Sequence, residues 1–401
     1  MLTIFVFYLR EPSAANALAP FGVKSGRLDA VDMRLLPKPV FSTLALAAVA
    51  AFAQNTQGPV QPPPRTPTQQ PPPTIKITSI YVVTPVTVQD SSGEFVLSLS
   101  QRDFHVFDNG AEQSIDGFDV AGVPLSAALI FETSSKITPY FPEIQKTGIL
   151  FTQNVLGTSG EAAILGYNDT VDHLQDFTQD HDQIEKVIKR LQPSTSGTRL
   201  FDALSQAVGM LRNQSTSRRR VIIIISDGTD TGSELPLGQV LREAQVANIT
   251  IYTVGLSPTA AAVRGEPKSG EPPPATPPGI EGEPQIPGTS TAEDEGQYQT
   301  GNVNLLNLAV WAVKNATKPI RQKPLEVAAV ATGGSYQGAM RDRSIESSID
   351  EIGAELNAQY ILTYHPAGQD AYGYHTIKVT IDVPDLRIRT RPGYFLQKPG
   401  S

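Results

Sequence analysis

The stretch that most constrains the fold is residues 218–233, RRRVIIIISDGTDTGS. Three arginines lead into five consecutive β-branched residues, which end at Ser226-Asp227-Gly228. A continuous β-branched run of this length predicts a strand buried on both faces, as in a parallel sheet covered by helices. The Asp227 carboxylate would then lie just beyond the carboxyl end of the strand, where open α/β sheets bind ligands. The alternative is that these polar residues only form a turn.

The composition is that of a globular protein with separate linkers. Of 401 residues, 40% are hydrophobic and 18% are charged, which allows a sizeable core, and the 33 prolines are clustered. The net charge of -8 argues against a nucleic-acid partner, because such binding depends on neutralising phosphates. The chain has no cysteine, which excludes disulfides, thiolate metal sites and a cysteine nucleophile.

Residues 33–53 have the pattern of a secretory signal peptide. Arg34 and Lys38 precede a short apolar run that ends in a small-x-small cleavage site. The run is too short for a comfortable transmembrane helix, so we expect no stable membrane span in the mature chain. We therefore expect translation to start at Met33, residues 1–32 to be untranslated, and the protein to be exported: periplasmic, secreted or associated with the cell envelope. An uncleaved anchor is the alternative.

A proline-rich segment and a small β-domain are predicted next. Residues 54–74 are rich in proline, which favours an extended spacer. Residues 75–121 alternate apolar and polar side chains in short runs, separated by turn signals that include Asn109-Gly110. We expect this β-domain to pack with the strands predicted at 358–396 as a support module.

Residues 122–357 alternate predicted strands with amphipathic helices, one of which is expected at 139–156. Such alternation implies right-handed βαβ units and a doubly wound, mostly parallel sheet of the Rossmann-like kind. Residues 258–300 interrupt the alternation with many prolines and acidic residues, and too few large apolar ones to offset the entropy of ordering. We interpret them as a disordered insertion. The predicted fold class is α/β, with accessory β-segments before and after the main domain.

The sequence carries no enzyme signature. None of the five histidines stands in an HExxH arrangement, and the chain lacks a GxSxG elbow, a Walker loop and a GxGxxG after a strand. We therefore expect a protein that is not an enzyme and has no catalytic residues. Asp202, near the start of a predicted helix, is expected to stabilise the helix N-terminus electrostatically.

Three polar loops follow successive predicted strands and should gather at one edge of the sheet. They contain residues 132–136 (ETSSK), 196–198 (SGT) and 227–230 (DGTD). Together with DFHVFDNGAEQSIDGF at 103–118 and a closing RPGYF, these loops resemble the von Willebrand factor A domains. The chain is most similar to the bacterial VWFA-related proteins, which join an exported β-segment to such a domain.

The resemblance implies a metal-ion-dependent adhesion site, in which a DxSxS loop, a threonine and an aspartate hold Mg²⁺ or Mn²⁺ and a carboxylate of a partner. Such oxygen ligands suit Mg²⁺, which also keeps exchangeable waters. The candidate ligands carried over are Glu132, Ser134, Thr198 and Asp227. Lys136 replaces the second serine, and an ammonium ~4 Å from a divalent ion would be repelled by roughly 8 kcal/mol at an effective dielectric of about 20. We therefore favour a degenerate site, with Lys136 paired to Asp227 or Glu132.

The expected function is recognition of a protein partner by an exported binding or adhesion module that does not require a metal. The partner-binding edge is expected to comprise Ser135, Lys136, Gly197, Gly228 and Asp230. Metal-dependent ligand binding at an adapted site and a structural subunit of an envelope assembly are the alternatives, and self-association is left open.

Overall fold

The structure, a computed structural model, describes seven stretches of the chain. These are residues 81–120, 122–256, 299–300, 303–320, 322–339, 344–367 and 372–398. The chain divides into two compact units, Met1–Thr74 and Ile75–Ser401, and every described residue belongs to the second. The predicted untranslated segment, signal peptide and proline spacer, and nearly all of the predicted insertion, therefore lie outside the described residues.

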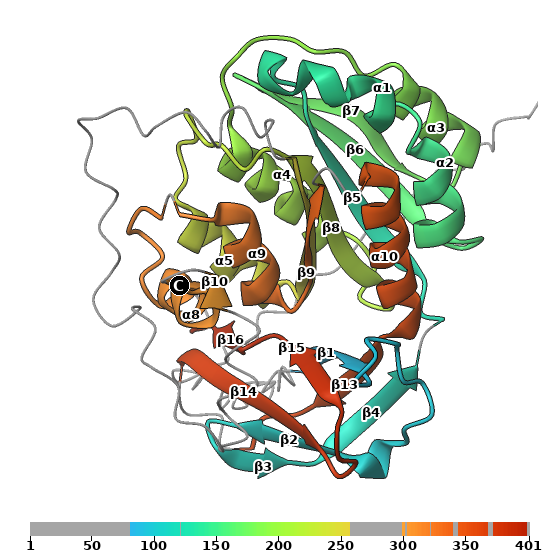
Figure 1. Cartoon of the computed structure of the whole chain (residues 1–401). Helices are drawn as coiled ribbons and strands as arrows, with labels where there is room; N and C mark the ends of the chain where they lie inside the picture. The colour runs from blue at the N-terminus through green and yellow to red at the C-terminus, as the bar shows by residue number, and fades with distance from the viewer. Residues whose placement is uncertain are drawn as a thin grey trace, which may run out of the picture. The chain divides into compact units, whose positions relative to one another are not determined.

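The main sheet has six strands (Figure 1). In spatial order they are β12 (Tyr336–Ala339), β9 (Ile249–Leu256), β8 (Arg219–Ser226), β5 (Leu125–Glu132), β6 (Glu161–Tyr167) and β7 (Val171–Thr178). The first five run parallel to one another, and β7 pairs antiparallel with β6 at one edge. The prediction of a doubly wound, mostly parallel sheet is confirmed.

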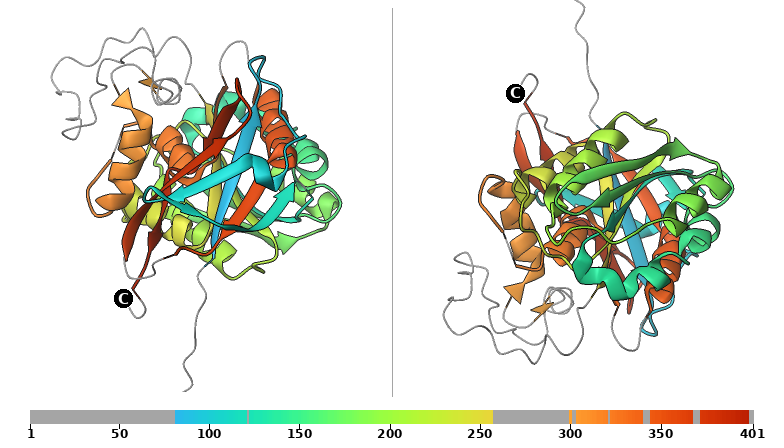
Figure 2. Two further views of the ribbon diagram at one scale, coloured as in Figure 1. Left: turned by 90° about the horizontal axis from the view of Figure 1, so that it is seen from below. Right: turned by 90° about the horizontal axis from the view of Figure 1, so that it is seen from above.

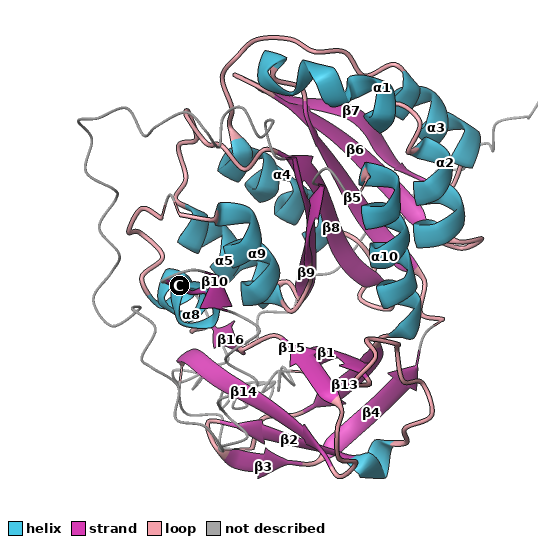
Figure 3. Ribbon diagram, viewed as in Figure 1, coloured by secondary structure: helices cyan, strands magenta, loops and turns pink. Residues whose placement is uncertain are grey.

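Helices cover both faces of the main sheet (Figures 2 and 3). On one face lie α4 (Leu200–Arg212), α5 (Leu237–Val246), α8 (Leu305–Lys314) and α9 (Pro324–Thr332). On the other lie α1 (Phe141–Ile144), α2 (Gly148–Leu150), α3 (His181–Lys189) and α10 (Ile345–Ala358). In the described stretches, no helix combines the length and the apolar character needed to cross a bilayer.

The β-branched run of the sequence forms β8, between β5 and β9 in the middle of the sheet. Ile222 and Ile224 belong to the core on one face of the sheet, and Val221, Ile223 and Ile225 belong to the core on the other. All five side chains are at most 1% exposed. Because both faces of the strand are buried, its apolar residues form a continuous run and do not alternate with polar ones.

Two parts of the domain differ from the sequence-based expectation. The helix predicted at 139–156 is broken into the 3-10 helix η2 (Ser135–Tyr140), α1, α2 and the π-helical η3 (Phe151–Leu156). Pro139 contributes to the break, because proline cannot donate an intrahelical hydrogen bond. Strands β7 and β12 were not predicted: β7 is a largely exposed edge strand of polar composition, and β12 has only 4 residues.

Two four-stranded antiparallel sheets form the β-module. The first has the order β15 (Arg387–Thr390), β1 (Val82–Gln89), β13 (Tyr360–Tyr364) and β4 (Ile115–Val120). The second has the order β16 (Gly393–Leu396), β14 (Gly373–Ile381), β2 (Phe104–Asp108) and β3 (Ala111–Gln113). Both sheets contribute side chains to one core, and each combines strands from before the main domain, coloured blue to teal in Figure 2, with strands from after it, coloured red. The accessory β-segments are thus two halves of one structure.

Three short elements complete the described chain. The 3-10 helix η1 (Gln101–Asp103) precedes β2, and β10 (Gln299–Thr300) pairs with β11 (Val303–Asn304) ahead of α8.

A buried polar network joins the end of α10 to both the main sheet and the β-module. The Gln359 side chain accepts a hydrogen bond from Arg219 of β8 and donates one to the Thr87 hydroxyl of β1 (3.2 Å). One turn earlier, Glu355 accepts from Thr87 (3.3 Å) and forms an ion pair with Arg389 of β15. The start of β8 is therefore tied to the β-module, whereas its carboxyl end is free to form a site.

Candidate functional site

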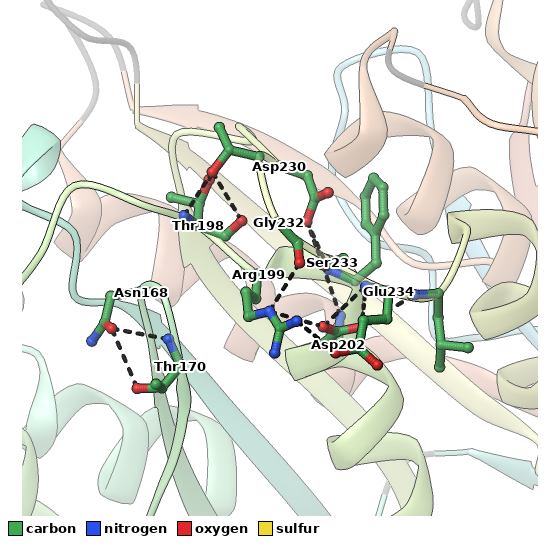
Figure 4. Close-up of polar contacts among 12 residues, drawn as sticks. Asn168, Thr170, Thr198, Arg199, Asp202, Asp230, Gly232, Ser233 and Glu234 are labelled. Atoms are coloured by element: carbon green, nitrogen blue, oxygen red, sulfur yellow. Dashed lines mark hydrogen bonds and ion pairs between the residues drawn. The ribbon is translucent and has the colours of Figure 1, made fainter.

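The polar loops predicted to meet lie at the carboxyl ends of β5 and β8 and before α4. We call residues 133–136, 194–199 and 227–235 the loop edge; part of it is shown in Figure 4. Parallel strands end at the same edge of a sheet, so the topology brings the first and third loops close together. The expectation that the second loop follows a strand is wrong, because residues 194–199 connect α3 to α4.

Backbone hydrogen bonds cross-link the three loops. The Ser135 amide donates to the Thr195 carbonyl (2.9 Å), which joins the first loop to the second. The Asp227 amide donates to the Glu132 carboxylate (2.8 Å), which joins the third loop to the end of β5. The second and third loops are joined through Thr198. The loop edge is therefore preorganised.

Glu132 is fully buried at the end of β5. Its carboxylate accepts hydrogen bonds from the hydroxyls of Ser134 and Ser226 (3.0 Å for Ser226) and from the Asp227 amide. Burial, and then the neighbouring Asp227 carboxylate, raise the pKa of Glu132 above its usual value. Within the described residues Glu132 forms no ion pair, so neutral donors are what hold this carboxyl group inside the protein.

Ser226 connects Glu132 to a buried tyrosine. The Tyr167 hydroxyl donates to Ser226 Oγ (2.6 Å), which itself donates to Glu132 and accepts from the Gly228 amide (2.8 Å). Burial, and then the charge of Glu132, raise the pKa of Tyr167 well above its usual value. The tyrosine therefore remains a hydroxyl donor, and the chain of hydrogen bonds runs in one direction towards the carboxyl group.

Thr198, in the second loop, is buried and contacts the third loop (Figure 4). Its amide donates to the Thr231 hydroxyl (3.0 Å), and the Thr231 amide donates to the Thr198 carbonyl (2.9 Å). The two hydroxyl oxygens are 3.3 Å apart. The threonine expected to be a ligand is thus also the residue that fixes the third loop.

The third loop also caps α4. Ser233 Oγ accepts from the amides of Phe201 (3.0 Å) and Asp202 (3.2 Å) and donates to the Asp230 carboxylate. Asp202 lies in the first turn of α4, as expected, and its carboxylate additionally accepts from the Glu234 amide (3.0 Å). The start of α4 and the third loop therefore stabilise each other. A side chain of the loop accepts hydrogen bonds from amides of the helix, and a side chain of the helix accepts one from an amide of the loop.

The remaining predicted residues fall on the same edge but differ in exposure. Ser134 is buried, Ser135 and Lys136 are exposed, and Gly197, Asp227, Gly228 and Asp230 are half-buried. The expected pairing of Lys136 with Glu132 or Asp227 is wrong, because neither pair is within ion-pair distance. Lys136 lies in the 3-10 helix η2 with its side chain in solvent, where the ammonium keeps its hydration.

The donor set does not fit the cation site that the resemblance implies. Of its three hydroxyl positions only Ser134 and Thr198 are present, because Lys136 occupies the third and places a cation at the rim. The fully buried Glu132 is already surrounded by neutral donors. Within the described stretches, no three histidine or acidic side chains come together in a way that could hold a metal ion.

A pocket of ≈ 570 Å³ opens beside Asp227. The acidic side chains of Asp227, Asp230 and Glu234 line it together with apolar ones. The apolar lining residues are Phe201, Leu235, Pro236, Leu237, Pro319, Ile320 and Pro324. Glu234 is paired with Arg199 (2.8 Å), whose charge also interacts with that of Asp230, but neither Asp227 nor Asp230 forms an ion pair among the described residues. The pocket therefore offers two carboxylates without an ion pair beside apolar walls.

Four residues of this site were missed by sequence reasoning: Tyr167, Ser226, Thr231 and Ser233. Ser226 and Ser233 are ordinary turn residues in the sequence, and their role depends on which strand and helix lie next to them. Thr231 and Ser233 follow Asp227 closely, which is the one local signal that they belong to the same loop.

Replacing Glu132 with glutamine should stabilise the protein increasingly as the pH rises. The pKa of Glu132 is raised in the folded state, so its contribution to stability is greatest below its usual pKa and is lost as the pH rises through the folded-state value. Glutamine keeps an oxygen for the Asp227 amide and does not ionise. Urea unfolding of both proteins between pH 4 and pH 8 measures the difference; a difference that is constant or falls with pH would contradict this assignment.

Comparison with known proteins agrees with the fold. Residues 128–266 match the family model of the von Willebrand factor type A domain. Solved structures that resemble the chain include BatB from Bacteroides thetaiotaomicron, with 17% identity over 58% of this chain and 97% of that one and a TM-score of 0.37. An aerotolerance-related membrane protein from Bacteroides fragilis shares 16% identity over 58% and 98%, with a TM-score of 0.36.

A third solved structure that resembles the chain is the vWF domain of the type V pili tip protein Mfa5 from Porphyromonas gingivalis. It shares 23% identity over 29% of this chain and 42% of that one, with a TM-score of 0.25. No curated protein matches the sequence.

Proposed function

Because the chain contains a von Willebrand factor type A domain, we propose that it is an exported, non-enzymatic binding protein whose loop edge recognises a protein partner without a bridging metal ion. The observation that carries the proposal is the pocket beside Asp227, in which Asp227 and Asp230 form no ion pair among the described residues. Export is proposed from the signal-peptide pattern of residues 33–53.

The chemistry of this pocket favours a basic side chain of the partner. The aliphatic stem of a lysine or arginine can lie along apolar walls while its charged group reaches carboxylates. Phe201 and Ile320 supply such walls, and Asp227 and Asp230 supply the carboxylates. The expected anchor is therefore opposite in charge to the carboxylate that a metal-bearing site would bind.

The cross-linked loops supply the rigidity that such recognition needs. Binding costs less when the recognising groups are already held in place. At the loop edge, hydrogen bonds of Glu132, Thr198 and Ser233 hold the backbone on which Asp227 and Asp230 stand.

Capture of partners from the envelope fraction of the parent cell tests the proposal. The bait is the full chain, either wild type or carrying Asp227→Asn with Asp230→Asn, and Asp182→Asn serves as a control that removes an exposed carboxylate of α3. We expect the wild type and the control to capture the same protein, the double variant to lose it, and EDTA to have no effect. A synthetic peptide with the sequence of the captured protein's binding segment should compete with that protein for the bait. The same peptide with its basic residues replaced by glutamine should not compete.

Two results would overturn the proposal. Equal capture by the double variant would show that the loop edge is not the binding face. Loss of capture in EDTA, restored by Mg²⁺, would favour the metal-dependent alternative.

A further inference from the structure

A second cavity lies at the opposite edge of the main sheet, where β8 and β9 begin. Its volume is ≈ 520 Å³, which is within the range of small-molecule sites. One wall comes from residues 216–221 and 247–250 of the main domain, and the other comes from β1, β13 and Arg391 of the β-module. The cavity is thus built where the two parts of the second unit meet.

Three arginines give this cavity a positive charge that carboxylates offset only from a distance. Arg219 donates to the Leu356 carbonyl (2.7 Å) and to the Gln359 side chain. Arg220 donates hydrogen bonds to the carbonyls of Ala247 and Gln214. Arg391 donates one to the side-chain oxygen of Asn248. In the described part of the chain, none of the three forms an ion pair with a carboxylate.

Arg391 is the most unusual of the three. It is 3% exposed, and its Nε and Nη2 atoms have no hydrogen-bond partner among the described residues; the same holds for Nε of Arg220. Burial lowers the pKa of Arg391 to about 10, a direct effect of removing its charge from water. A buried cation with unused donors is costly unless a counter-charge accompanies it.

The rest of the lining combines apolar and polar residues, and the polar ones include Arg218, which pairs with Glu161. Val83 and Pro85 of β1, Ile361 of β13 and Ile249 of β9 face the same space. Of the described lining residues Asp119 alone carries a carboxylate, and it is exposed. A ligand that satisfies this cavity must therefore combine an anionic group with an apolar body.

We propose that this cavity binds a small organic carboxylate whose apolar body lies against Val83 and Ile361 and whose carboxylate is held by Arg220 and Arg391. The unpaired Nε and Nη2 atoms of Arg391 are buried in the protein. In this proposal the guanidinium turns towards the cavity when the ligand enters, and these atoms then bind the carboxylate. A planar guanidinium suits this role because it can bind a carboxylate through two parallel hydrogen bonds. The cavity and the loop edge lie at opposite ends of β8, so the two proposals can fail independently.

Calorimetric titration of the full chain with octanoate tests this proposal, with 1-octanol as the uncharged probe. Octanoate should bind in a 1:1 ratio and octanol should not bind. Arg220→Gln should weaken octanoate binding about tenfold or more, since it removes a charge-assisted contact. Val83→Trp fills the cavity without removing a charge and should abolish binding. Arg212→Gln, which removes an exposed arginine at the end of α4, should leave the affinity unchanged.

Arg391→Gln should also lose octanoate binding. The circular dichroism spectrum and melting curve of this variant show whether it still folds. If it does not fold, the Arg220→Gln and Val83→Trp variants still test whether octanoate binds in this cavity. The proposal is overturned if octanoate does not bind, if octanol binds as well as octanoate, or if folded Arg220→Gln and Val83→Trp proteins both bind octanoate like the wild type.

Discussion

Replacing Asp108 with alanine should lower the free energy of unfolding by about 3 kcal/mol or more, because it leaves several buried polar groups without their partner. Asp108 ends β2 and is 5% exposed. Its carboxylate accepts from the hydroxyls of Tyr394 (2.7 Å) and Tyr364 (3.1 Å), and its other oxygen lies 2.9 Å from His375 Nδ1. These partners come from β16, β13 and β14, so one side chain connects both sheets of the β-module.

Urea unfolding measures this effect, and two further variants make the result interpretable. Tyr394→Phe removes one hydroxyl of the network and should cost only about 1 kcal/mol. Asp116→Ala removes an exposed carboxylate of the same module, whose partner is the half-buried His365, and should change stability much less than Asp108→Ala does. If Asp108→Ala and Asp116→Ala unfolded at the same urea concentration, the network would not be a main support of the β-module.

Replacing Gly334 with alanine should lower the free energy of unfolding by about 2 kcal/mol or more, because the added methyl group has no room. A Cβ at this position would lie 2.1 Å from the carbonyl oxygen of Ile251 in β9. The obstacle is backbone in the sheet, which cannot move aside as a flexible side chain would. The turn after α9, which places β12 beside β9, would have to shift.

Gly209→Ala is the matched control for Gly334→Ala. Gly209 is exposed in α4, and a Cβ there meets nothing within 4 Å. Alanine is favoured over glycine in a helix by roughly 0.5–1 kcal/mol, so this variant should be as stable as the wild type or more stable. Thermal and urea unfolding of both variants check the pair. Similar losses for both would mean that the close approach of Gly334 to β9 is not what matters.

The two proposed sites lie at opposite ends of β8, and their charges are opposite. At its amino end, Arg219 and Arg220 help to line a basic cavity, and at its carboxyl end Asp227 lines an acidic pocket. The stretch 218–233 therefore contributes to both, with the buried strand between them as a rigid support.

The sequence by itself determined the main architecture. The run Val221 to Ile225 predicted a strand buried on both faces, because such a strand is a continuous apolar run. The alternation of strands with amphipathic helices predicted the sheet, because burial on one face gives a helix a periodic apolar pattern. The ends of parallel strands meet at one edge, so the positions of Glu132 and Asp227 along the chain were enough to predict that they lie close together. Thr198, in the connection from α3 to α4, could not be placed by this rule.

Only the tertiary structure decided what these groups do. Ser226 became a hydrogen-bond hub because β6 and β5 place Tyr167 and Glu132 around it, and Lys136 points to solvent because its loop turns into a 3-10 helix. Arg219 and Arg391 are far apart in the sequence, and they line one cavity only because strands from both ends of the chain pair in the β-module. Periodicity records which face of an element is buried, but the partner of a buried polar group comes from a distant segment and leaves no local mark.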